Sequence, residues 1–197
     1  MGKIRNLKVY KGMLIVVDMV NGFVREGVLH DERIADVIPR QLELIKEAKH
    51  RGDLIVFVKD THDIDAIEFK RFGNTKHCVR GTSEAELVDE FREFENDDDT
   101  ISIEKNSTSF MEAVEFRKLL SEMINLRRVD VVGCCTDICD FNGTMGMANY
   151  FDQHNRDVEI NVHTDAVATY AEEDRKNYVD ASYLLMKQQG IQLVKKK

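Results

Sequence analysis

The chain has few of the features that mark membrane, secreted or nucleic-acid-binding proteins. It has no tryptophan, a single proline and only four cysteines among 197 residues. No apolar run approaches the roughly 20 residues that a membrane-spanning helix needs, and no signal-peptide core follows the first residues. Acidic residues outnumber basic ones, and the net charge of −8 makes nucleic acid and anionic membranes poor partners. We therefore expect a cytoplasmic protein whose cysteines are thiols rather than disulfides.

The chain does have enough apolar side chains, 43% of its residues, for one globular domain spanning residues 1–197. Apolar runs typical of buried strands alternate with stretches of helical spacing, without a repeat or a linker. This alternation predicts a three-layer α/β/α domain with a mostly parallel sheet of about six strands, of Rossmann-like topology. The expected strands are 13–18, 54–59, 100–104, 128–133, 157–163 and 191–194, and the expected helices are 39–51, 109–124, 138–154 and 172–189. Ser109 and Glu112 match a capping box at the start of the second of these helices.

Chemically active side chains stand at the ends of several predicted strands. Asp18, Asp60 and Lys105 each follow or close an apolar strand, and the turn 133–139 ends at Cys139. In open parallel sheets, ligands bind in a crevice at the carboxyl ends of the strands. The four positions therefore predict one catalytic crevice.

Cys139 is the candidate nucleophile of this crevice. A thiol at a helix N-terminus is close to backbone N–H groups, so we expect its pKa to fall toward the thiolate. Desolvation would raise the pKa of Asp18 and suit it to accept the thiol proton, and Lys105 could stabilise the charged forms or an oxyanion. The alternatives are a buried hydrophobic cysteine, a turn aspartate and an exposed lysine.

The segment 60–99 holds a candidate metal site. It is too long for an ordinary connection, and long loops in compact domains are often functional. Asp60, His62 and His77 would make three ligands with open positions for water or substrate, as in catalytic zinc sites. The alternative is two unrelated loop histidines. A zinc site at Cys134, Cys135 and Cys139 is disfavoured because the paired CxxC spacing is missing, and Cys78 reads as a small buried hydrophobe.

Taken together, these motifs resemble the isochorismatase-like cysteine hydrolases and, within them, the nicotinamidases. The resemblance runs from about Met13 to near the C-terminus. It rests on the stretches 14–23, 60–62, 77–82, 104–105 with 109–110, and 133–139, and on Asp165-Ala166 after the fifth strand.

The resemblance implies a catalytic triad of Asp18, Lys105 and Cys139. Asp18 would take the thiol proton, the thiolate would attack the carboxamide carbon of nicotinamide, and ammonia would leave. Water would then hydrolyse the thioester to nicotinate, a step of NAD salvage. The family's oxyanion hole maps to the backbone N–H groups of Cys135 and Cys139, with a cis peptide bond between Cys134 and Cys135.

The resemblance also implies a metal ion, zinc most of all, with iron or manganese as alternatives. Its ligands would be Asp60, His62 and His77, with Glu68 as a fourth. Two neighbouring carboxylates compete for that fourth place, namely Asp63 and Asp65. Two side chains are expected to contact the substrate, namely Phe23 and Cys134, and the protein is expected to form a homo-oligomer.

Two departures from the family pattern bear on the substrate. Asp140 follows the nucleophile where valine is usual, and Asn74 stands where nicotinamidases often carry an aromatic, commonly tryptophan. Phe69 or Phe72 would then supply the ring contact. Two alternatives follow: a cysteine amidohydrolase of the same superfamily acting on another small amide or carbamoyl compound, and a non-catalytic binding or scaffold protein that kept the fold. Isochorismatases proper lack the nucleophilic cysteine.

Overall fold

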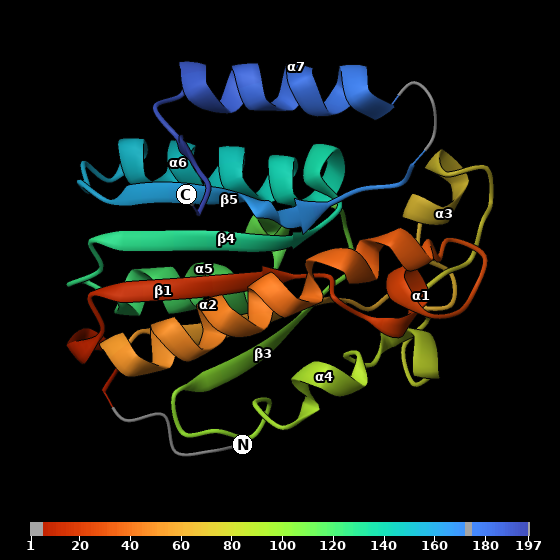
Figure 1. Ribbon diagram of the computed structural model, residues 1–197, viewed down its shortest axis with the longest axis horizontal. Coiled ribbons are helices and arrows are strands. Elements are labelled where there is room, and N and C mark those ends of the chain that lie inside the picture. The colour runs from red at the N-terminus through yellow and green to blue at the C-terminus, as the bar shows by residue number, and fades with distance from the viewer. Residues whose placement is uncertain (1–5, 172–174, 197) are drawn as a thin grey trace.

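The computed structural model describes residues 6–171 and 175–196 and contains a six-stranded sheet with the order β3-β2-β1-β4-β5-β6 (Figure 1). All neighbouring strands run parallel. The strands are β1 Gly12–Val17, β2 Leu54–Asp60, β3 Thr100–Lys105, β4 Arg128–Cys134, β5 Glu159–Ala168 and β6 Gln192–Val194. Each of the six predicted strands is confirmed, and so is the predicted fold class.

Helices cover both faces of the sheet, which produces the three layers (Figure 1). They are α1 Asn21–Val24, α2 Ile38–Arg51, α3 Glu68–Arg71, α4 Asp89–Arg92, α5 Val114–Glu122, α6 Phe141–Gln153 and α7 Arg175–Gln188. Pro39 lies in the first turn of α2, and Gly52 ends that helix with a left-handed backbone, φ 72°. Among the described residues, no helix is long and apolar enough to cross a membrane.

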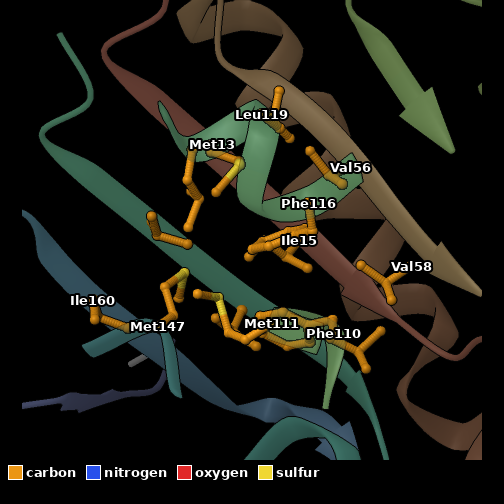
Figure 2. Packing of buried hydrophobic residues seen from close by; sticks show 14 of the residues in the cluster. Met13, Ile15, Val56, Val58, Phe110, Met111, Phe116, Leu119, Met147 and Ile160 are labelled. Carbon is orange, nitrogen blue, oxygen red and sulfur yellow. The ribbon is translucent and has the colours of Figure 1, made fainter. Parts of the chain in front are cut away.

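The sheet separates two hydrophobic cores, and β1 contributes to both. Met13 and Ile15 face the layer of α5, α6 and α7, where Phe116 and Met147 pack (Figure 2). The alternate residues Leu14 and Val16 face the layer of α2. Every residue of β1 is buried, which explains why the central strands read as continuous apolar runs rather than as alternating ones.

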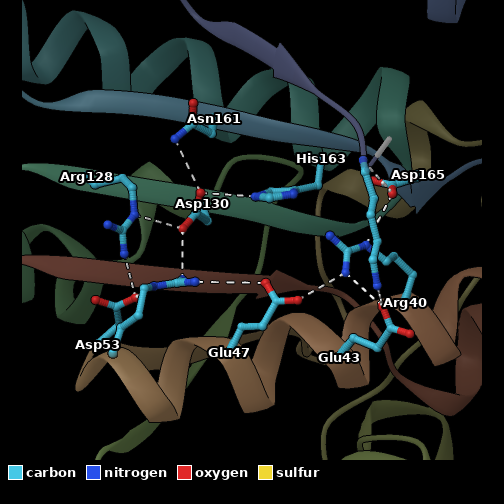
Figure 3. Close-up of polar contacts among 11 residues, drawn as sticks. Arg40, Glu43, Glu47, Asp53, Arg128, Asp130, Asn161, His163 and Asp165 are labelled. Carbon is cyan, nitrogen blue, oxygen red and sulfur yellow. Dashed lines mark hydrogen bonds and ion pairs between the residues drawn. The ribbon is translucent and has the colours of Figure 1, made fainter.

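A polar network joins α2 to the sheet between these layers. Asp130 of β4 accepts hydrogen bonds from Arg128, Arg51 and Asn161 and lies 3.0 Å from His163 Nε2 (Figure 3). Burial would raise the pKa of Asp130, but His163 and Arg128 hold it below its ordinary value. The carboxylate is therefore charged and fully paired at neutral pH.

Some element boundaries differ from the sequence prediction. The capping box at Ser109 does not form: its side chain makes no capping bond, and a 3-10 turn at Phe110–Glu112 ends in an extended Ala113 before α5 begins. Burial of Phe110 against Phe116, with ring centroids 4.8 Å apart, decides this local geometry. The strand β5 continues to Ala168, so Asp165 and Ala166 lie inside it rather than after it.

The helix expected over 138–154 begins with a π-helical turn, Thr136–Asp140, which leads into α6. The helix expected over 172–189 is confirmed as α7, and the positions 172–174 lie outside the described residues. The region 60–99 is irregular as predicted, with only the short helices α3 and α4 and one 3-10 turn, Ser83–Ala85.

Candidate active site

A cavity of about 340 Å³ opens at the carboxyl ends of the central strands. Its walls come from segments far apart in the chain, because the loops after β1, β2 and β4 all emerge at this edge. The lining includes Phe23, Asp60, Glu68, His77, Cys135 and Cys139. The predicted crevice is therefore present.

Lys105 lies at the centre of the charged groups. Its Nζ is 2.9 Å from Asp18 Oδ2, 2.6 Å from Asp60 Oδ1 and 3.6 Å from Cys139 Sγ. Lys105 and Asp60 are partners in the β2–β3 register, while Asp18 follows β1 with a left-handed backbone, φ 52°. All four side chains are buried. The structure thus brings together the three residues of the predicted triad.

Charge balance in this cluster is set by one ammonium group between two carboxylates. Burial raises the pKa of Asp18 to about 6, against the opposing effect of Lys105. Burial works against the charge of Lys105 as well, but Asp18 and Asp60 raise the pKa of the ammonium group well above its ordinary value. Asp60 is held below its ordinary pKa by Lys105 and His62 despite its burial. Lys105 and Asp60 are therefore charged, and Asp18 titrates near pH 6.

The expected low pKa of Cys139 is wrong for the protein as it stands in this structure. Burial raises the pKa of the thiol well above its ordinary value, Lys105 opposes this, and Asp18 and Asp60 add to it. The cysteine lies in the first turn of a helical segment, as predicted, but that turn is buried, and burial is the largest influence on the thiol. The resting nucleophile therefore keeps its proton, and a base must remove it.

Cys134 and Cys135 directly precede the π-helical turn, and their side chains lie in different surroundings. The peptide bond between Cys134 and Cys135 is cis, as the resemblance implied. Cys135 lines the cavity, whereas Cys134 is fully buried, donates its S–H to the carbonyl oxygen of Asp18 at 3.2 Å and does not line the cavity. We expected Cys134 to contact the substrate. In the structure its thiol is directed to the backbone of Asp18 and not into the cavity.

The predicted metal ligands form one buried cluster beside the triad. One nitrogen or oxygen atom from each of Asp60, His62 and His77 lies within 4.8 Å of the others. His62 Nε2 is 2.9 Å from Asp60 Oδ2, and His77 Nε2 is 3.5 Å from the same oxygen. This is the donor set of a divalent metal site with open positions.

The outer hydrogen bonds of both histidines fit a bound cation. His62 Nδ1 lies 2.8 Å from Asn106 Oδ1, and His77 Nδ1 lies 3.0 Å from the carbonyl oxygen of Thr75. Both partners can only accept, so each Nδ1 donates a hydrogen bond and each Nε2 faces the cluster, the arrangement in which a histidine nitrogen can bind a metal ion. The two Nε2 atoms and the carboxylate oxygen of Asp60 therefore form a set that can hold a divalent cation.

Glu68 is the carboxylate best placed to complete the cluster. Its Oε1 is 3.6 Å from His62 Nε2, and its Oε2 accepts a hydrogen bond from the N–H of Thr108 at 3.0 Å. Glu68 is buried, whereas the competing residues Asp63 and Asp65 are exposed. Burial therefore favours Glu68 over both.

Aromatic rings surround the histidines. Phe69 packs edge-on against His62 with ring centroids 5.1 Å apart, and Phe23 lies 5.9 Å from His77. Phe23 and Phe72 line the cavity, whereas Asn74 is a turn residue, φ 61°, and does not. The aromatic side chains that line the cavity beside His77 are thus Phe23, Phe72 and Tyr170. Cys78 is fully buried, as predicted.

Three further residues belong to the site although the sequence analysis did not predict them: Asn106, Tyr170 and Arg175. Asn106 directly follows Lys105 and orients His62, and its place beside a predicted catalytic residue could have indicated it. Arg175 and Tyr170 line the far wall, and Arg175 donates to Asp137 at 2.7 Å. They come from the β5–α7 region, whose approach to the cavity depends on the tertiary fold.

The family model described as Isochorismatase domain matches residues 12–195. Nicotinamidase 1 of Arabidopsis thaliana is 30% identical over 142 residues, which are 66% of this chain and 57% of that protein. A second Arabidopsis thaliana protein, described as a probable inactive nicotinamidase, is 29% identical over 93 residues, 43% of this chain and 47% of that protein. The chain thus spans about half the length of these curated relatives.

Two solved structures resemble the whole fold. The pyrazinamidase of Pyrococcus horikoshii in complex with zinc is 27% identical, with a TM-score of 0.73 and coverage of 94% of this chain and 99% of that one. N-carbamoylsarcosine amidase from Thermoplasma acidophilum is 25% identical, with a TM-score of 0.72 and coverage of 94% and 96%.

Proposed function

The chain belongs to the isochorismatase family, and we propose that within it this protein is a metal-dependent amidohydrolase that converts nicotinamide to nicotinate and ammonia. The observation that carries the proposal is the contact of Lys105 with Asp18 and Cys139 beside the cluster of Asp60, His62 and His77. One cavity thus offers a nucleophile with its base and a place for a cation. Further support comes from the likeness to Nicotinamidase 1 and to the zinc-bound pyrazinamidase.

The first half of the reaction follows from the protonation states. Asp18, as a carboxylate above about pH 6, takes the proton that Cys139 keeps at rest. The sulfur attacks the carboxamide carbon, and Lys105 stabilises the negative charge on the sulfur before the attack. In this proposal the backbone N–H groups of Cys135 and Cys139 stabilise the oxyanion, an effect worth roughly 3 kcal/mol.

The second half returns the residues to their starting state. Protonated Asp18 gives its proton to the leaving nitrogen, and ammonia departs from a thioester on Cys139. Asp18 then accepts a proton from water, whose oxygen attacks the thioester carbon. The C–S bond then breaks, the acid product leaves, and Asp18 returns its proton to the thiolate of Cys139.

The cation would be held by Asp60, His62 and His77, with Glu68 near the fourth position. When bound, a divalent ion supplies a Lewis acid that can hold the pyridine nitrogen of the substrate, directly or through water. Phe23 and Phe72 provide apolar surface for the ring. Zinc fits this oxygen and nitrogen donor set, with iron or manganese as alternatives.

The test is ammonia release from nicotinamide by the purified protein loaded with zinc. Cys139→Ala should lower turnover by about 10⁴-fold or more, the order expected when a nucleophile is removed. Cys78→Ala removes a buried thiol that does not line the cavity and should keep turnover. Absence of turnover by the folded, zinc-loaded wild type would refute nicotinamide as the substrate.

A second candidate is hydrolysis of another small amide or carbamoyl compound by the same triad. The likeness to N-carbamoylsarcosine amidase favours it. A panel of small amides and carbamoyl compounds, assayed for ammonia with the same two variants, separates the candidates. If Cys139→Ala changed neither turnover nor ligand binding, the scaffold hypothesis would replace both. The cytoplasmic location and the homo-oligomer stay predictions.

A further inference from the structure

Part of the cavity wall takes no part in the proposed reaction. It is built by the loop after α1, which contributes Leu29 and Asp31, and by the chain after β5, which contributes Tyr170, Ala171 and Arg175. The cavity volume of about 340 Å³ lies within the range of pockets that hold drug-sized ligands, roughly 300–1,000 Å³. Which molecules reach the nucleophile therefore depends on how these two parts of the chain are held together.

Asp31 joins the two parts of this wall. Its Oδ2 accepts a hydrogen bond from the backbone N–H of Ala171 at 3.1 Å. Its own backbone N–H donates to the carbonyl oxygen of Phe23, in α1, at 3.0 Å. Phe23, Asp31 and Ala171 all line the cavity. One residue thus connects three segments of the wall: α1, the loop that follows it, and the chain after β5.

Arg33 fixes the orientation of the Asp31 carboxylate. Its Nε lies 3.0 Å from Oδ1, its Nη2 lies 2.9 Å from Oδ2, and its backbone N–H donates to Oδ1 at 3.0 Å. The hydrogen bonds from Arg33 lower the pKa of Asp31 to about 2. Asp31 is therefore a carboxylate at neutral pH, and its Oδ2 is held toward the backbone of Ala171 as a charged acceptor.

Other contacts hold β5 and the π-helical turn independently of Asp31. Gln41 of α2 is fully buried and donates a hydrogen bond to a carbonyl oxygen of β5 at 2.8 Å. Asp137, within the π-helical turn, accepts a hydrogen bond from the hydroxyl of Thr169, just after β5, at 2.5 Å. Loss of the Asp31 carboxylate would therefore free the backbone of Ala171 and leave β5 and the turn in place.

We propose that Asp31 is a specificity-determining residue: its hydrogen bond to Ala171 closes the cavity wall and limits the size of the molecules that reach Cys139. A small amide enters while the wall is closed, whereas a larger molecule enters only when this hydrogen bond breaks. The role of Asp31 rests on the proposed function only in taking Cys139 as the nucleophile.

The test compares the rates at which iodoacetamide and its larger N-benzyl derivative alkylate Cys139, localised by fragment-ion mass spectrometry. Both reagents are neutral and share one reactive group, so they differ in size alone. Asp31→Ser keeps a side-chain oxygen that can cap the 3-10 turn Glu32–Val37 but lacks the second oxygen that holds Ala171. The variant should react with the N-benzyl reagent roughly tenfold faster than the wild type, the effect of losing one hydrogen bond to a charged group. Its rate with iodoacetamide should stay at the wild-type value.

Asp36→Ser is the matched control, because it removes an exposed carboxylate from the same 3-10 turn. It changes the net charge equally and should keep both wild-type rates. Asp31→Asn is the second variant if Asp31→Ser does not fold. Asparagine is an equally good cap residue, but its amide group replaces one of the two acceptor oxygens, so the N-benzyl rate should again rise relative to the iodoacetamide rate.

Two results would overturn the role of Asp31. If the ratio of the two rates were the same in the wild type and in the Asp31 variant, the hydrogen bond to Ala171 would not limit access. If both reagents were accelerated equally, the substitution would have loosened the whole site, and Asp31 would have a structural role only. Alkylation needs no substrate, so the test stands even if nicotinamide is not turned over.

Discussion

The pKa of Asp18 is raised by burial and lowered by the ion pair with Lys105. Its pKa of about 6 lies above the ordinary value because burial outweighs the ammonium group. Only the carboxylate can accept the thiol proton, so the base is present above pH 6 and is lost as the pH falls below it. The same residue therefore links the charge cluster to the rate of the proposed reaction.

We predict that kcat/KM falls about tenfold per pH unit below pH 6, because each unit lowers the carboxylate fraction of Asp18 tenfold. The measurement is a pH profile of kcat/KM from pH 4.5 to 8 on whichever amide is turned over. Asp18→Asn should lose activity throughout, because its amide cannot accept the proton. A profile that stays level from pH 5 to pH 8 would contradict the assignment of Asp18 as the base.

Asn106 acts on the metal cluster without belonging to it. Its Oδ1 fixes the ring of His62 so that Nε2 faces Asp60. Loss of such an outer partner commonly lowers metal affinity by about 10–100-fold, and we expect a loss of this order for Asn106→Ala. Zinc affinity is measured by competition with a chelating dye.

Asp63→Ala is the matched control for that measurement, because it removes an exposed carboxylate next to His62 in the chain. Its zinc affinity should equal that of the wild type, and His62→Ala should bind zinc far more weakly than either. Equal affinities for wild type and Asn106→Ala would mean that Asn106 does not orient the ligand. Removal of the metal by a chelator should abolish the proposed turnover, and zinc should restore it.

At the scale of single elements, α6 carries the nucleophile turn and must pack closely on the segment after β3. Gly143 makes this possible: a Cβ there would lie 2.1 Å from Cε1 of Phe110, which is fully buried. The π-helical turn Thr136–Asp140 precedes this contact directly. The position of Cys139 therefore depends on the packing of α6 as well as on the end of β4.

We predict that Gly143→Ala destabilises the fold by about 1–3 kcal/mol, the usual cost of overpacking a core. Gly146→Ala is the control on the same helix, because its Cβ would lie 3.1 Å from Cγ of the flexible side chain of Met111. There the gain in helix propensity, up to about 1 kcal/mol, offsets the contact. Urea unfolding measures both, and equal stabilities of the two variants would refute the packing argument.

At the scale of the whole molecule, the layer of α2 is joined to the sheet by buried charges as well as by apolar contacts. Asp130 collects four polar partners from α2, β4 and β5 (Figure 3). Its pKa is depressed in the folded protein. A depressed carboxyl pKa contributes stability above the unfolded value of about 3.9, and this contribution is lost as the pH falls through the folded value.

We predict that Asp130→Asn lowers the free energy of unfolding by about 1–3 kcal/mol at pH 7, because it weakens charge-assisted hydrogen bonds. The difference from the wild type should shrink as the pH falls below about 3.9. Glu47→Gln changes a half-exposed carboxylate of the same network and should stay within about 0.5 kcal/mol of the wild type. A difference for Asp130→Asn that does not depend on pH would contradict the electrostatic explanation.

The amino-acid sequence by itself determined the six strands, the parallel sheet and the strand-end positions of Asp18, Asp60, Lys105 and Cys139. It could do so because strands buried on both faces leave continuous apolar runs, and parallel strands bring their carboxyl ends to one edge. Local signals failed where distant packing decided the backbone. The capping box at Ser109 is the example, because burial of Phe110 took precedence.

Only the tertiary structure decided which groups face the cavity and which of them carry a proton. The sequence favoured Glu68 but left Asp63 and Asp65 as competitors; the burial of Glu68 and its distance of 3.6 Å from His62 Nε2 distinguish it from both. The raised pKa values of Cys139 and Asp140 likewise arise from burial and from charged groups elsewhere in the fold. Protonation depends on what surrounds a group in three dimensions, and neighbours along the chain supply only part of those surroundings.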